Sequence, residues 1–272
     1  MSLQASQILA NIALSFSSVR LNKGGSVMNR YSLLIIVGVM VCYELAVEIV
    51  DKPIILPSIL LIFTELCRII FSSSFVSIIW VTLVRTMMTF SCVFIISLIL
   101  GVFSGYFKII RLLLSPIVTF LRTVPTISVT IILLIWFGRD LGPIMIMALV
   151  IFPLLYELIG GAMNDIDPDL LDVCLLFGAT HFETFKALYY PQLLKILSSG
   201  VQATIGLSFK VMVMAEVMGQ SQVGIGQQLN YEKTYLNMPA VFAWTIVLIL
   251  LVMFFEIIIG YLIKKLIRHL DA

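Results

Sequence analysis

Four isolated ionisable residues, Arg85, Arg122, Lys210 and Glu216, are the first candidates for chemistry, because they lie within or beside long apolar runs. A charge at mid-bilayer costs roughly 2.5–3.5 kcal/mol on insertion scales, so such residues are retained for pairing, gating or solute passage. Lys210 and Glu216 are six positions apart, which places them on different faces of a helix. We expect Lys210 to face a pathway or a second copy of the chain. The alternative is an ion pair with Glu157 or Glu216 of a neighbouring helix.

The residue types that an enzyme or a metal site would need are sparse. The sequence contains only 2 His, and its 4 Cys form no CxxC pair, so we interpret the cysteines as small buried hydrophobes. These cysteines are Cys42, Cys67, Cys92 and Cys174. No nucleophile triad and no GxxxxGK[ST] phosphate loop is present. We therefore expect a chain that is not an enzyme and has no cofactor or metal of its own.

The elements that position these residues must be membrane helices. Apolar residues make up 61% of the 272 residues and charged residues 12%, against about 45–50% and about 25% in soluble domains. A soluble globule of this size would expose large apolar patches. The composition excludes a soluble enzyme, a nucleic-acid binder, a disordered chain and a secreted disulfide scaffold. It predicts an all-α polytopic membrane protein.

Charge-poor runs predict about six transmembrane helices, each long enough to cross a core of about 30 Å when its ends are included. They cover residues 31–50, 86–107, 123–138, 141–158, 197–218 and 237–255. Residues 57–71 are expected to form a short extramembrane or interfacial helix. Residues 1–29 are predicted to be a tail, either disordered or interfacial. Residues 30–272 are predicted to be a single transmembrane domain.

Basic residues predict the orientation of these helices. With the N-terminus inside, ten Lys and Arg lie in inside segments and four in outside segments. The outside four are Lys52, Arg68, Arg139 and Lys233. The asymmetry predicts that both termini are cytoplasmic. At the ends of spans, Glu44, Glu48 and Glu256 are expected to snorkel toward water, and Arg85 could do the same.

The interval 164–195 is the longest charged stretch between spans and is placed on the cytoplasmic side by this orientation. Aspartates around Pro168 predict a helix start, because acidic side chains are favoured at a helix N-terminus. We expect one helix over residues 169–177 and a break at Gly178. Thr180 followed three positions later by Glu183 has the spacing of a capping box and predicts a second short helix. Pro191 is expected to end it.

A helix–glycine–helix elbow of this kind suits insertion into a groove of a partner protein. From the residues alone, an amphipathic loop on the membrane surface is an equal alternative.

The elbow resembles the EAA loop of ABC importer permeases, E-A-A-x3-G-x9-I-x-L-P. The motif positions are filled in order by Asp172, Val173, Cys174, Gly178, Leu188, Tyr190 and Pro191. Flanking stretches are similar to the nitrate/sulfonate/taurine-type permeases, in the same order along residues 56–266. They are WVTLVR (80–85), LRTVP (121–125), WFG (136–138), IDP (166–168), AEVMG (215–219) and GIG (224–226).

This resemblance implies a type I ABC importer permease fold. It implies that two permease copies pair, as a homodimer, around a central pathway. Two cytoplasmic ATPase subunits would bind ATP and Mg, and an extracytoplasmic solute-binding protein would deliver the substrate. The elbow would dock on the ATPase through Asp172, Cys174, Gly178, Ala179, Thr180, Phe182 and Pro191. The resemblance also makes Arg85, Arg122 and Glu216, together with Lys210, candidates for pairing or for lining a pathway or gate.

The sequence thus predicts a permease subunit of an ATP-driven importer in a bacterial cytoplasmic membrane, in contact with lipid and not with nucleic acid. The expected solute is small and polar or anionic, of the nitrate, sulfonate, taurine, bicarbonate or thiamine-precursor class. The alternative is an ATP-independent secondary transporter or channel, which paired broken helices or inverted repeats would favour. An intramembrane enzyme would need clustered catalytic groups inside the spans, and only scattered charges occur.

Overall fold

The computed structural model describes residues 25–178 and 180–270, and the chain divides into two compact units, Met1–Lys52 and Pro53–Ala272. The described part of the first unit is helix α2 (Gly25–Val50). This helix contains the predicted first span, 31–50, and begins before it. Of the predicted tail, residues 1–24 lie outside the described residues.

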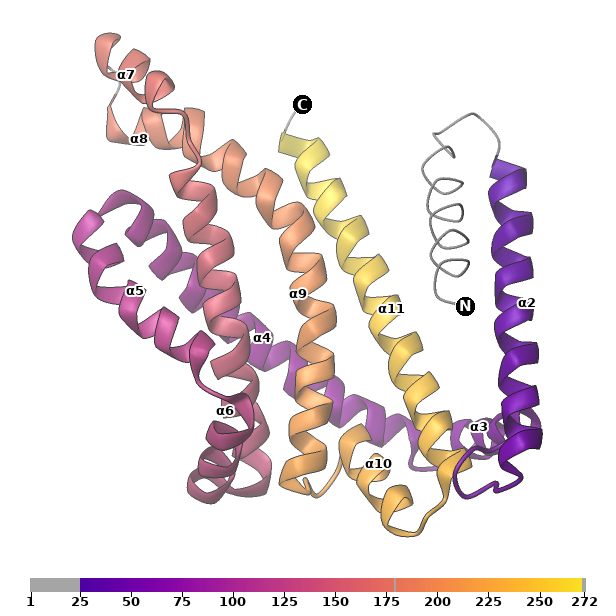
Figure 1. The fold of residues 1–272 in the computed structure, drawn as a ribbon. Coiled ribbons are helices and arrows are strands. Elements are labelled where there is room, and N and C mark those ends of the chain that lie inside the picture. The colour runs from indigo at the N-terminus through magenta and orange to yellow at the C-terminus, as the bar shows by residue number, and fades with distance from the viewer. Residues whose placement is uncertain (1–24, 179, 271–272) are drawn as a thin grey trace, which may run out of the picture. The chain divides into compact units, whose positions relative to one another are not determined.

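The described part of the second unit consists of helices and turns (Figure 1). Its elements are α3 (Ile59–Ile70), α4 (Phe75–Tyr106), α5 (Lys108–Thr123), α6 (Thr126–Asn164), α7 (Pro168–Leu176), α8 (His181–Thr184), the π-helical turn η1 (Phe185–Tyr189), α9 (Tyr190–Gly219), α10 (Ile225–Thr234) and α11 (Met238–Leu270). Four described segments are long and apolar enough to cross a membrane: Phe75–Tyr106, Thr126–Asn164, Gly200–Gly219 and Met238–Ile263. The predicted all-α membrane architecture is confirmed.

Helix α6 contains two of the predicted spans, divided at Gly138. That residue has φ +72° and ψ −164°, which breaks the helix. A Cβ on Gly142 would lie 2.7 Å from Leu134, so the two arms fold back against each other. The first arm starts at Thr126 instead of the predicted 123, because Val124 precedes Pro125 and is held extended at φ −65° and ψ 132°.

Helix α4 begins well before the predicted span 86–107, which changes the position of Arg85. That arginine now lies inside a helix, ten residues after its start at Phe75. The predicted short helix 57–71 is confirmed as α3, whose N-cap Ser58 accepts a hydrogen bond from the Leu61 N–H.

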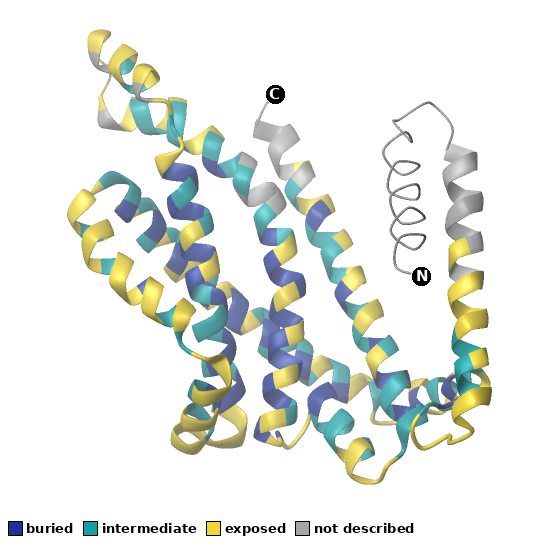
Figure 2. Cartoon of the chain, in the orientation of Figure 1, coloured by how far each residue is buried: buried dark blue, intermediate teal, exposed yellow. Residues whose placement is uncertain are grey.

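The core of the second unit lies where α4, α6 and α9 meet. Buried residues of α6 and α9, among them Met147, Ile151, Phe209 and Met212, pack together at its centre (Figure 2). Glycines permit a close approach of α4 to α6, since a Cβ on Gly105 would overlap the Met163 side chain. Small residues thus allow close helix packing here.

Helices α7 and α8 precede α9 and helix α10 follows it, so they lie at opposite ends of this 30-residue helix (Figure 1). The candidate site therefore has two parts, one at each end of α9: a buried ionic cluster near α10 and the elbow formed by residues 164–195.

Candidate functional site: a buried ionic cluster and an exposed elbow

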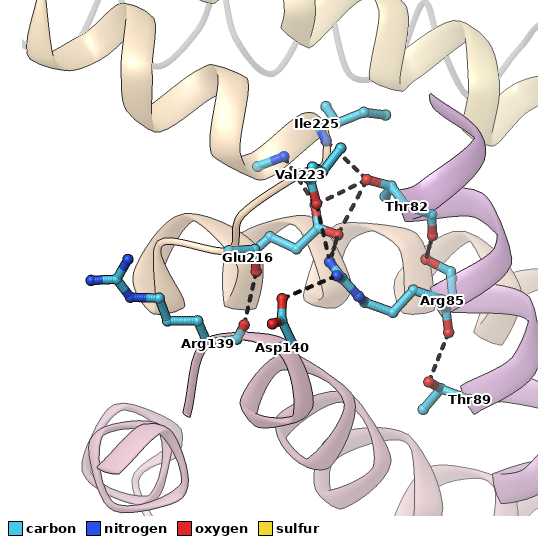
Figure 3. Close-up of polar contacts among 11 residues, drawn as sticks. Thr82, Arg85, Thr89, Arg139, Asp140, Glu216, Val223 and Ile225 are labelled. Carbon is cyan, nitrogen blue, oxygen red and sulfur yellow. Dashed lines mark hydrogen bonds and ion pairs between the residues drawn. The ribbon is translucent and has the colours of Figure 1, made fainter. Parts of the chain in front are cut away.

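Glu216 of α9 has a fully buried side chain and accepts hydrogen bonds from several donors (Figure 3). Arg85 of α4 donates from Nη1 to Oε1 at 2.6 Å, and its own side chain is only 12% exposed. Thr82, one helical turn before Arg85, donates its hydroxyl to Oε2 at 3.0 Å. The predicted candidates Arg85 and Glu216 therefore form one buried ion pair. The structure supports pairing of Arg85 and not snorkelling at the end of a span.

The loop after α9 and the first residues of α10 close over this carboxylate. The Gly226 N–H donates to Glu216 Oε2 at 3.0 Å, and the Ile225 N–H donates to the Thr82 hydroxyl at 2.8 Å. Gly224 has φ +148°, a conformation that side chains rarely adopt, and a Cβ there would lie 2.6 Å from Oε2. A Cβ on Gly226 would lie 2.6 Å from the backbone oxygen of Val213. Both glycines of the GIG sequence are thus required by the close approach of the loop to α9.

The turn at Gly138 supplies a third element to the cluster. Asp140 Oδ1 lies 3.7 Å from Arg85 Nη2, and the Ser221 hydroxyl donates to the Arg139 carbonyl at 3.1 Å (Figure 3). The cluster therefore ties α4, α6, α9 and the α9–α10 loop together at one end of the bundle. No group of three metal-ligating side chains occurs among the described residues. What this arrangement does is structural: its ion pair and hydrogen bonds hold α4, α9 and the start of α10 together.

The other two predicted candidates lie apart from this cluster. Arg122 donates from Nη1 to both carboxylate oxygens of Glu157, at 2.5 and 2.6 Å, and both side chains are substantially exposed. A neighbouring pocket of about 230 Å³ between α4, α5 and α6 is lined by polar groups that include Arg111, Glu157 and Asn164. Lys210 is exposed. Among the described residues Glu157 and Glu216 each form an ion pair with an arginine, and no ion pair joins either carboxylate to Lys210.

The elbow presents large apolar side chains to its surroundings. Leu176, Phe177 and Phe182 are 85%, 86% and 75% exposed, on both sides of Gly178. Gly178 has φ +69° with open space around the position of a Cβ, so the glycine is required by backbone conformation and not by crowding. Asp172 is exposed and Cys174 partly exposed on α7, while Ala179 lies outside the described residues.

The predicted capping box is present at the start of α8. The Thr180 N–H donates to Glu183 Oε2 at 2.8 Å, and the Glu183 N–H donates to the Thr180 hydroxyl at 3.3 Å. The hydrogen bond from the Thr180 backbone lowers the pKa of the Glu183 carboxyl from its ordinary value. Its contribution to the cap is therefore present above the unfolded-state pKa and is lost as pH falls through the lower, folded-state pKa.

Replacing Thr180 by alanine is expected to loosen the start of α8. An N-cap threonine contributes about 1 kcal/mol, so amide hydrogen exchange over residues 181–184 should become about fivefold faster. Hydrogen exchange read by mass spectrometry on the purified chain measures this. Glu183→Gln is the matched control, because glutamine also completes a capping box. Equal exchange in Thr180→Ala and the parent would contradict the role of the cap.

The sequence predicted that Pro191 ends the second elbow helix, and the structure contradicts this. The chain passes from α8 through η1 into α9, and Pro191 lies in the first turn of α9. Proline is tolerated there because the first amides of a helix have no intrahelical partner. The wider π-turn joins the elbow directly to the long helix. Two residues of this turn, Phe185 and Tyr189, pack with Tyr106 of α4. The centres of the Tyr106 and Tyr189 rings are 5.2 Å apart.

A match to a known protein family covers most of this architecture. Residues 94–268 match the family described as binding-protein-dependent transport system inner membrane component. The chain belongs to this family. The matched residues include the elbow, all of α9 and Glu216, while Arg85 and Thr82 lie before them. The predicted resemblance to ABC importer permeases is confirmed, and the chain is a membrane transport subunit.

Individual relatives of this permease carry different names. A Bacillus subtilis protein named as a putative aliphatic sulfonates transport permease, SsuC, is 28% identical over 56% of this chain and 55% of its own length. A protein of Methanocaldococcus jannaschii named as an ABC transporter permease is 23% identical over 77% of this chain and 80% of its own. The riboflavin transport system permease protein RibX of Chloroflexus aurantiacus is 24% identical over 57% of this chain and 58% of its own length. The alignment thus spans little more than half of SsuC.

Among solved structures, a chain of the MetNI methionine ABC transporter, in inward-facing conformations, has the same fold. The two superpose with a TM-score of 0.58 at 21% identity, over 70% of this chain and 94% of that chain. The predicted importer-type permease fold is confirmed by this match.

Sequence reasoning missed the permease's Thr82 and Asp140 and the backbone donors of the GIG loop. Thr82 lies three positions before Arg85, a spacing that places the two on one helical face and was a usable signal. Glu256 was expected to snorkel at a span end. It lies instead inside the candidate span Met238–Ile263, with its carboxylate so close to Gly206 of α9 that a Cβ there would overlap it.

Proposed function

We propose that this chain is the permease subunit of an ATP-driven importer that forms, with a second copy of itself, the membrane pathway for a small polar or anionic solute. Two cytoplasmic ATPase subunits would engage the elbow, and an extracytoplasmic binding protein would deliver the solute. Both termini would lie in the cytoplasm of a bacterial cell.

The geometry of the elbow carries this proposal. Three large apolar side chains, Leu176, Phe177 and Phe182, are more than 70% exposed on a short capped unit that continues into α9. Exposed apolar side chains on a defined turn are typical of a protein contact. Because the elbow runs through η1 into a 30-residue helix, a movement of the elbow would be carried into the bundle core.

The ATP chemistry is assigned to the partner. The sequence has no GxxxxGK[ST] phosphate loop, so ATP and Mg would be held by the ATPase subunits. The elbow and α10 lie at opposite ends of α9 and are built differently. This difference favours contacts with a different partner protein at each end.

The solute class rests on the sequence resemblance to nitrate/sulfonate/taurine-type permeases, and among the named relatives only SsuC points to the same class. Aliphatic sulfonates and riboflavin appear in the names of two of them, and methionine in the name of the transporter that shares the fold. For this chain we propose a small polar or anionic solute, with nitrate, sulfonates, taurine, bicarbonate and thiamine-precursor pyrimidines as the candidates to test.

Reconstitution in liposomes tests the proposal against an ATP-independent carrier. The tagged chain is co-expressed with candidate ABC ATPase and solute-binding proteins from the same genome, and uptake of each radiolabelled candidate is followed. We expect copurification with the ATPase and accumulation only with enclosed ATP and binding protein. Accumulation by the permease alone, driven by an ion gradient, would identify a secondary transporter instead.

A further inference from the structure

One face of α9 stays open in the second unit, and Lys210 lies at its centre. The rest of the helix is packed by α4, α6, α10 and α11, and buries residues such as Phe209 and Met212 completely. The exposed positions recur every three or four residues and so form a single strip along the helix. They are Ala203, Leu207, Lys210, Met214 and Met218.

The α9 strip differs in composition from the other exposed faces of the bundle. On α11, the exposed face carries large apolar residues such as Ile249, Met253 and Ile257, which are 51%, 52% and 66% exposed. The exposed face of α4 is similar, with Ile95 and Ile99 among its members. Such faces suit hydrocarbon chains. A strip with a small residue and a cation at its centre does not suit hydrocarbon chains.

Lys210 cannot place its charge in water by snorkelling along this strip. It lies nine or ten residues from either end of the candidate span Gly200–Gly219, which is about 15 Å of helix and beyond the reach of its four-carbon stem. Within the described part of the chain it forms no hydrogen bond or ion pair. Glu256 of α11 lies against Gly206, one helical turn from Lys210, and forms no ion pair with Lys210 among the described residues.

An unpaired, exposed cation at mid-span is stable where water or a solute reaches it. Resting on the proposed function, we propose that the α9 strip borders the aqueous pathway and that Lys210 makes this pathway selective for solutes that carry an anionic group. The selectivity is electrostatic, because the ammonium lowers the energy of an anion and raises that of a cation at the same depth.

Thiol labelling of the assembled transporter tests both statements. In a background with Cys42, Cys67 and Cys92 replaced by alanine and Cys174 of the elbow retained, Met214→Cys reports on the strip, one turn from Lys210, after the labelling of the reporter-free background is subtracted. Met253→Cys on α11 is the matched control, since the two methionines are 43% and 52% exposed. The probes are two membrane-impermeant methanethiosulfonates, the anionic sulfonatoethyl and the cationic trimethylammonioethyl reagents. Copurification with the ATPase is scored before labelling, so failure of the proposed function is seen separately.

We expect Met214→Cys to react with both probes and Met253→Cys with neither. Adding Lys210→Met should lower the ratio of anionic to cationic reaction rates at Met214→Cys about 3- to 10-fold, since unit charges one helical turn apart interact even in water. Lys210→Arg should keep the ratio. Equal reactivity of the two reporters would overturn the pathway assignment. A ratio unchanged by Lys210→Met would overturn the selectivity.

Discussion

Replacing Phe182 by aspartate is expected to abolish ATP-driven uptake and to release the ATPase from the permease. Phe182 is 75% exposed and follows closely after Thr180, whose capping hydrogen bonds fix the start of α8. In protein interfaces a buried aromatic anchor contributes about 2–4 kcal/mol, so a charge at this position should weaken ATPase binding by about 30- to 1,000-fold. Copurification of the ATPase with the tagged permease and uptake into proteoliposomes measure the two effects.

Phe71→Asp is the matched control. Phe71 is 87% exposed at the C-cap of α3, whose buried face packs against the first half of α11, away from the elbow. The same substitution there should leave ATPase binding unchanged. If Phe182→Asp retained the ATPase while the permease remained folded, the elbow would not be the docking unit.

The elbow was predictable from the sequence because its determinants are local. Thr180 and Glu183 are three positions apart, and the hydrogen bonds that join them depend only on that spacing. Gly178 likewise specifies a positive φ by its own conformational freedom. What the spacing did not reveal was the π-turn, because a wider helical turn changes no residue pattern. It is this turn that makes the elbow continuous with α9.

The ionic cluster could be predicted only in part, because its contacts are distant in sequence. Arg85 and Glu216 are 131 residues apart, and Arg122 and Glu157 are 35 apart. Helical periodicity says which face a charge occupies on its own helix, and not which helix faces it. The isolated charges did make pairing one of the expected roles, beside gating and solute passage. The partners follow from the fold, in which the turn at Gly138 and the GIG loop close around α4.

The buried cluster also makes a strong prediction about stability. Glu216 is inaccessible to solvent and receives hydrogen bonds from Arg85, Thr82 and the Gly226 backbone. Glu216→Ala removes the acceptor for all three and leaves the Arg85 guanidinium, 12% exposed, with only Asp140 at 3.7 Å as a counter-charge among the described residues. Removing one member of a buried pair destabilises by about 3–5 kcal/mol, so we expect a large loss of folded transporter.

A double-mutant cycle separates the effect of an uncompensated buried charge from that of a general packing defect. Glu216→Gln retains an oxygen for the Gly226 and Thr82 donors, so it should be less harmful than Glu216→Ala. Combining Glu216→Met with Arg85→Met removes both charges and should recover stability that either single change loses, because no uncompensated charge remains in the apolar bundle. Thermal unfolding of the purified transporter, followed by size-exclusion chromatography after heating, measures each of these variants. Additive losses in the double variant would show that the two charges do not stabilise each other.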